Sequence, residues 1–71
     1  RNLIYREQRV HLHASAKLGP ETVVASDTSI GAKTIVTRTV IGRDCKIGAN
    51  CVISNSFIWG GCTIEDDCVV D

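Results

Sequence analysis

Branched aliphatic residues recur along this chain at a nearly constant step of six residues. The step shortens to five only twice, from Val36 to Ile41 and from Ile53 to Ile58. The residue two positions before each aliphatic one is small or compact at every repeat after Val10. The aliphatic positions are Leu12, Leu18, Val24, Ile30, Val36, Ile41, Ile47, Ile53, Ile58, Ile64 and Val70, and the small ones are Ala16, Thr22, Thr28, Thr34, Thr39, Cys45, Cys51, Ser56, Cys62 and Cys68. Two such registers indicate a repeat architecture.

The six-residue period predicts short strands separated by turns. Strand alternation places the small and the aliphatic residue on one inner side and points the residue between them outward. Units of this length, three to a coil, are typical of the hexapeptide parallel β-helix. The shortened steps place the missing residue in turns near 37–38 and 54–55, which gives coils of 17 residues over 24–40 and 41–57. We therefore expect an all-β fold with three short strands per coil and fewer than four full coils.

Two features of this fold remain open at this point. Gly follows the aliphatic residue at Gly19, Gly31, Gly42 and Gly48, which suits either a positive φ or a close backbone approach. Parallel crossovers are nearly always right-handed, and the period alone does not set the hand, whereas resemblance to known hexapeptide proteins implies left-handed coils. We also expect residues 1–71 to be a single segment of a longer chain, with both coil ends covered by flanking sequence or a packed neighbour, because uncovered coil ends are unpaired strand edges.

Composition narrows the classes of function. Eight basic residues balance eight acidic ones, which argues against a nucleic-acid-binding domain because such a domain needs a basic patch. No apolar run reaches the length of a membrane span. We therefore expect neither nucleic acid nor membrane among the partners.

The four cysteines, at positions 45, 51, 62 and 68, occupy the small inward register. We interpret them as buried small hydrophobic residues, replacing the threonines of earlier coils. Their spacing is unlike that of structural zinc ligands, which have two to four residues between the members of a pair, whereas here five intervene. Disulfides between stacked coils are sterically conceivable, because neighbouring strands lie about 4.8 Å apart. A cytosolic location would disfavour them.

The polar candidates for catalysis are few. A general base needs positioned partners, and on this register His11 points outward and His13 lies in a turn. The acidic run from Glu65 to Asp67 has the pattern of a solvated turn. No phosphate-binding loop or dinucleotide fingerprint is present. We predict no catalytic residue, no metal ligand and no cofactor in this segment.

The outward positions differ between the three sides of the predicted prism. One side is polar, with His11, Ser29, Lys46 and Thr63. The second carries Lys17 and then Ile35, Val52 and Val69, and the third carries Val23, Val40 and Phe57, preceded by Tyr5 if the register extends that far. Trp59 lies beside Phe57 in a turn. Although Val and Ile favour strands even when exposed, aromatic residues mark interfaces, so the candidate protein interface is Phe57, Trp59, Val40, Val23, Ile35, Val52 and Val69.

The segments "NLIYREQRV" and "TVIGRDCKIGANCVISNSFIWGGCTIEDDCVVD" resemble one family over essentially the whole chain. The residues that carry the resemblance are Asn2, Ile4 and Tyr5 at the start, the paired "VIG" and "NS-x-I" steps, and "FIWGG" at 57–61. They are similar to the β-helix of the epsilon subunit of eukaryotic translation initiation factor 2B.

The resemblance implies a scaffold and assembly role in the cytoplasm. The family's epsilon subunit also has a nucleotidyltransferase-like domain and a C-terminal helical domain that catalyses guanine nucleotide exchange on initiation factor 2. Neither domain is in this segment, so the segment itself is expected to have no enzyme activity. The implied partners are other subunits of the factor, notably gamma, and initiation factor 2. Two alternatives remain, the oligomerisation β-helix of a sugar-nucleotide pyrophosphorylase and a hexapeptide acyltransferase.

Overall fold

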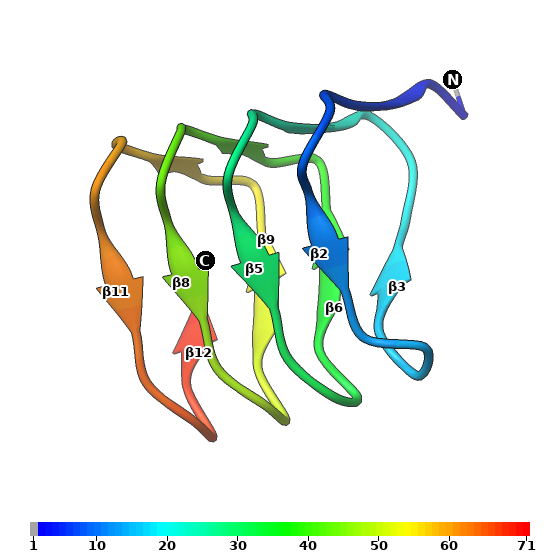
Figure 1. The fold of residues 1–71 in the computed structure, drawn as a ribbon. Coiled ribbons are helices and arrows are strands. Elements are labelled where there is room, and N and C mark those ends of the chain that lie inside the picture. The colour runs from blue at the N-terminus through cyan, green and yellow to red at the C-terminus, as the bar shows by residue number, and fades with distance from the viewer. Residues whose placement is uncertain (1) are drawn as a thin grey trace.

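The computed structural model describes residues 2–71, which form twelve short strands (Figure 1). The strands of the first two coils are β1 (Ile4–Arg6), β2 (His11–Leu12), β3 (Lys17–Leu18), β4 (Thr22–Val24), β5 (Ser29–Ile30) and β6 (Ile35–Thr37). Those of the last two are β7 (Val40–Ile41), β8 (Lys46–Ile47), β9 (Val52–Ser54), β10 (Phe57–Ile58), β11 (Thr63–Ile64) and β12 (Val69–Val70). The part of the chain described contains no helix that could cross a membrane.

Every third strand stacks on the same side, which makes three parallel four-stranded sheets. Their orders are β1-β4-β7-β10, β2-β5-β8-β11 and β3-β6-β9-β12. The registers pair Tyr5 with Val23 and Val23 with Val40, so the register does extend to Tyr5. The predicted parallel β-helix with three strands per coil is confirmed. The fourth coil ends on β12 without returning to the first sheet.

The coils wind with a left hand, as the resemblance implied (Figure 1). The chain runs down the near side through β2, up the far side through β3 and back over the top through β4, advancing by one coil. The right-handed preference arises where twisted strands feed a long crossover. Strands of two or three residues accumulate too little twist to impose it.

The corners between strands have a common backbone conformation. Within residues 2–71, ten residues have positive φ, and nine of these are not glycine. Arg9 precedes Val10, and each of the other nine directly precedes a small inward residue. The corner at 13–15 has none, and there the Ser15 N–H donates to His13 Nδ1 over 3.1 Å. Sequence analysis did not anticipate these left-handed residues, because Asp, Asn, Lys and Arg at turn positions also fit ordinary turns.

Replacing one of these corner residues by glycine should stabilise the fold. In Lys33, φ is 61°, a conformation that costs a residue with a Cβ about 1–2 kcal/mol. Glycine removes that cost. It also destabilises the fold by about 0.5–1 kcal/mol, because it has more conformational freedom to lose when the chain folds. Lys33→Gly should therefore raise the free energy of unfolding by about 0.5–1 kcal/mol, measured by urea denaturation. The matched control Lys17→Gly, in strand β3, should lower it, and a lower stability for both variants would contradict the explanation.

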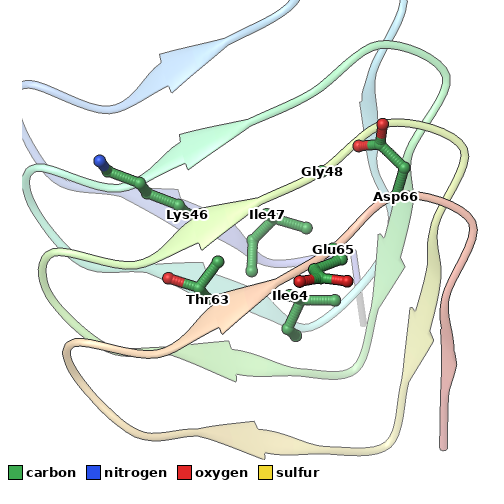
Figure 2. A pocket seen from close by; sticks show the side chains of 7 residues that line it. All are labelled: Lys46, Ile47, Gly48, Thr63, Ile64, Glu65 and Asp66. Atoms are coloured by element: carbon green, nitrogen blue, oxygen red, sulfur yellow. The ribbon is translucent and has the colours of Figure 1, made fainter.

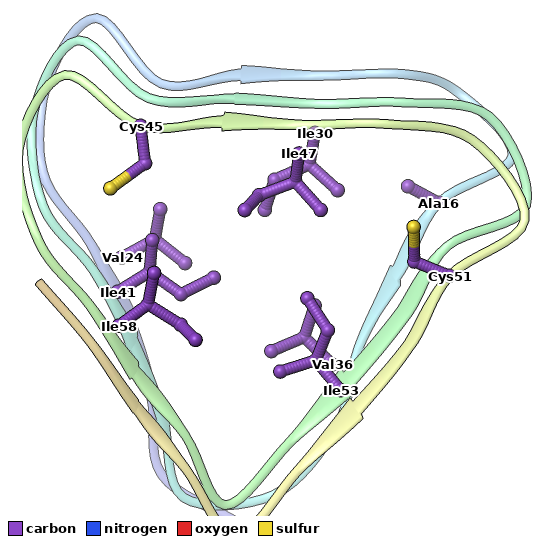
Figure 3. Packing of buried hydrophobic residues seen from close by; sticks show 10 residues of the cluster. All are labelled: Ala16, Val24, Ile30, Val36, Ile41, Cys45, Ile47, Cys51, Ile53 and Ile58. Atoms are coloured by element: carbon purple, nitrogen blue, oxygen red, sulfur yellow. The ribbon is translucent and has the colours of Figure 1, made fainter. Parts of the chain in front are cut away.

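The aliphatic register fills the interior of the prism (Figure 3). Val24, Val36, Ile41 and Ile53 have no exposed surface. Stacking along the axis brings each against its equivalent one coil away, as in the pairing of Val24 with Ile41. The core is therefore a set of aliphatic columns, one on each side of the prism.

The small inward register lines the corners and joins neighbouring coils by hydrogen bonds. The Thr28 hydroxyl donates to the Gly42 carbonyl over 2.8 Å and accepts the Cys45 N–H over 3.2 Å. The Thr34 hydroxyl likewise donates to Gly48 over 2.6 Å and accepts from Cys51 over 3.1 Å. No buried side-chain nitrogen or oxygen in the described residues lacks a partner. The threonines of this register are small and polar because their hydroxyls bond the backbone of the next coil.

Candidate protein-binding surface

Two of the three outer sides of the prism are apolar. We call Tyr5, Val23, Val40, Phe57 and Trp59 the aromatic face. The first four point outward from β1, β4, β7 and β10 in direct register. Tyr5 and Phe57 are 54% and 57% exposed, and the two valines are less so. The predicted stripe is thus a continuous column of side chains rather than scattered residues.

Trp59 extends the aromatic face around the corner that follows β10. Its side chain is 72% exposed and meets the Phe57 ring edge to face, with ring centroids 5.1 Å apart. The neighbouring coil carries Gly42 at the equivalent place, and glycine has no side chain to cover the indole. The backbone of this corner is held, because the Gly61 N–H donates to the Arg43 carbonyl over 2.8 Å. This corner contains both Gly60 and Gly61, yet it is hydrogen-bonded to the preceding coil.

The side formed by β3, β6, β9 and β12 is mainly aliphatic. We call Ile35, Val52 and Val69 the aliphatic face. They stack in register, and Lys17 of the first coil pairs with Ile35. Ile35 and Val52 are each 44% exposed and Val69 is 76% exposed. The aliphatic face adjoins the aromatic face across the corners at 37–38 and 54–55, where the two shorter steps occur, as the sequence predicted.

The third side is polar and serves as a comparison within the same molecule. His11, Ser29, Lys46 and Thr63 stack there in register. Figure 2 shows its C-terminal end, an open depression whose lining includes Lys46 and Thr63. The nearby Asp66 carboxylate accepts the Ala49 N–H over 2.8 Å. Asp66 therefore bonds the backbone of the previous coil, in an exposed turn as expected.

The histidines and cysteines lie where the repeat predicted, with one correction. His11 is exposed on a strand and His13 lies in a corner. Cys45 and Cys51 are buried, while Cys62 and Cys68 are half-buried. The interpretation of the cysteines as merely hydrophobic was incomplete, because the Cys45 and Cys51 thiols donate to the carbonyls of Trp59 and Glu65, each over 3.1 Å. Thr28 and Thr34 occupy the equivalent positions one coil earlier and also donate to backbone carbonyls of the next coil. Their place in the sequence repeat was the signal that could have predicted hydrogen bonding by these cysteines.

No described residues form a group suited to metal binding. Within residues 2–71, no three His, Cys, Asp or Glu side chains gather closely enough to hold an ion. The clearest charged contact is between Arg9 and Asp27, with 2.7 Å from Nε to Oδ1. The hydrogen bond from Arg9 lowers the pKa of the Asp27 carboxyl. Both side chains are largely exposed, so the pair adds little to stability.

The comparisons with known proteins identify the family. A family model described as the EIF2B subunit epsilon LbH domain, a left-handed β-helix, matches residues 1–71. No curated protein matches the chain. A chain of the crystal structure of the CcmM N-terminal domain in complex with CcmN shares the fold, with a TM-score of 0.52 and 15% identity over 99% of this chain and 96% of that one. The family match covers the whole sequence, and the chain belongs to the β-helix domain family of the epsilon subunit of translation initiation factor 2B.

Proposed function

We propose that this β-helix is an assembly scaffold within translation initiation factor 2B. Its aromatic and aliphatic faces would be buried against other subunits, with the gamma subunit as first candidate and initiation factor 2 as second. Guanine nucleotide exchange belongs to another part of the parent subunit in this proposal. The segment positions that activity in the cytoplasm and takes no part in the chemistry.

The contrast between the three faces carries the proposal. All three consist of short parallel strands with the same repeat, so strand propensity acts equally on each. The polar face nevertheless has Ser29, Lys46 and Thr63 at the outward positions, whereas the aromatic face has Val23, Val40 and Phe57. Contiguous exposed apolar side chains are typical of protein interfaces. Strand propensity alone therefore does not account for the aromatic face.

Trp59→Ala tests this function. Tryptophan is enriched among the hot-spot residues of interfaces, whose truncation removes at least about 2 kcal/mol of binding energy, roughly 30-fold in affinity. The variant should weaken association of the epsilon subunit with its partner subunits by about that factor, measured by quantitative co-purification or surface plasmon resonance. Its melting temperature should stay close to that of the unchanged protein, since Trp59 lies outside the core.

Thr63→Ala is the matched control, because Thr63 is also exposed but lies on the polar face. It should leave association unchanged. Equal affinity for the Trp59→Ala variant and the unchanged protein would contradict a role for Trp59. Equal losses in both variants would contradict the assignment of the interface to the apolar faces.

A further inference from the structure

The four thiols form two columns inside the prism, each spanning the third and fourth coils. Cys62 follows Cys45 by 17 residues, and Cys68 follows Cys51 by 17, which is one coil in both cases. Backbone hydrogen bonds place each pair side by side: the Lys46 N–H donates to Cys62 and the Val52 N–H donates to Cys68, both over 3.0 Å. We propose that these stacked pairs are oxidation sites, at which a hydroperoxide forms the cross-coil disulfides Cys45–Cys62 and Cys51–Cys68.

The geometry selects pairing between coils over pairing within a coil. Neighbouring strands lie about 4.8 Å apart, inside the Cα separation of about 4.4–6.8 Å that disulfides span. Cys45 and Cys51, in contrast, lie at different corners of the triangular cross-section (Figure 3). The equivalent positions of the second coil hold Thr28 and Thr34. The disulfides would therefore join the last two coils and no others.

The half-buried thiols react first, because Cys45 and Cys51 have no exposed surface. The Cys62 thiolate attacks one peroxide oxygen, the O–O bond breaks, and a sulfenic acid forms as hydroxide leaves. The Cys45 thiol then loses its proton, its sulfur attacks the sulfenic sulfur, and the S–O bond breaks with loss of a second hydroxide. With hydrogen peroxide as oxidant, two thiols and one peroxide give one disulfide and two waters.

Such a disulfide would be readily reversible. Side chains that leave neighbouring parallel strands in the same direction keep their Cβ atoms near the strand spacing of about 4.8 Å. Disulfides prefer a Cβ separation of about 3.8 Å, and a strained disulfide is more easily reduced. Closing the Cys45–Cys62 bond also removes the hydrogen that the Cys45 thiol donates to the Trp59 carbonyl. Oxidation would therefore alter the corner that presents Trp59, although the disulfide itself does not depend on the proposed function.

The test uses the full epsilon subunit in its complex. The protein is treated with hydrogen peroxide, its remaining thiols are alkylated, and a non-reduced digest is analysed by mass spectrometry. We expect two cross-linked peptide pairs, 45 with 62 and 51 with 68, that disappear after dithiothreitol. We also expect a change in tryptophan fluorescence on oxidation. The variant Cys62→Ser should lose the first pair and keep the second.

Three outcomes would overturn the proposal. One is complete alkylation of all four cysteines after peroxide treatment. Another is oxidation only to sulfinic acids, with no cross-linked peptide. The third is pairing of 45 with 51, of 62 with 68, or between molecules only. Each of these is read directly from the peptides, so failure of the disulfides is distinguished from failure of the interface, which is measured by subunit association.

Discussion

Ile41→Ala should lower the free energy of unfolding by about 2–5 kcal/mol. Ile41 has no exposed surface and lies at the centre of its column, paired with Val24 on one side and Ile58 on the other. Removing three carbons there leaves a cavity that the rigid stack of coils cannot close. Because small domains have a total stability of about 5–15 kcal/mol, this is a large part of the whole. Urea denaturation followed by circular dichroism measures it.

Ile35→Ala is the matched control for this prediction. Ile35 is also an isoleucine in a strand of this β-helix, but it points outward and is 44% exposed. Its truncation should cost less than about 1 kcal/mol, because little buried surface is lost. A similar loss in both variants would mean that the inward and outward registers do not differ in burial in solution.

Gly31→Ala should destabilise the fold by about 3 kcal/mol, the upper end of what overpacking usually costs. A Cβ on Gly31 would lie 2.7 Å from the Gly48 carbonyl carbon and 2.8 Å from the Ala49 nitrogen. Both are backbone atoms of the next coil, so no side-chain rotation relieves the clash. The coils must separate at this corner, which weakens the 2.9 Å hydrogen bond from Gly31 to Ile47. Thermal denaturation should show the loss as a lower melting temperature.

Gly61→Asn provides the opposite case. Gly61 has φ of 79°, but a Cβ there would meet no atom within 4 Å. Asp27 and Asp44 adopt positive φ at the same corner of the preceding coils, and Asn tolerates this conformation better than most residues. Gly61→Asn should therefore change stability by less than about 0.5 kcal/mol. A larger loss than that of Gly31→Ala would contradict the explanation from close approach.

Much of the fold followed from two sequence registers. The aliphatic register predicted the core, and the small register two residues earlier predicted the corners, because strand alternation puts both on one side. The shortened steps gave the coil length of 17 residues, and that length sorted the outward residues onto three faces. The pairing of Phe57 with Val40 and of Val52 with Ile35 is therefore a consequence of the repeat length alone.

Other features depended on contacts between coils and could not be obtained from the chain pattern. Glycine after an aliphatic residue allowed either a positive φ or a close approach, and only the stacking of Gly31 on Gly48 decided for the second. The left-handed conformation of Lys33 could not be predicted from its residue type, since lysine is common in turns of every kind. The thiol hydrogen bond from Cys45 to Trp59 joins residues 14 apart, which requires the next coil in place.

The sequence by itself thus determined which residues face inward and outward, because those depend on local alternation and a constant repeat. The tertiary structure decided the hand of the coils, the conformation of each corner and the exposure of each face. These depend on how one coil packs on the next, a relation between residues about one coil apart that no local pattern contains. The candidate interface reflects this division: Phe57 was found from its outward position and Trp59 from its place in the turn beside it. Their edge-to-face contact was found only in three dimensions.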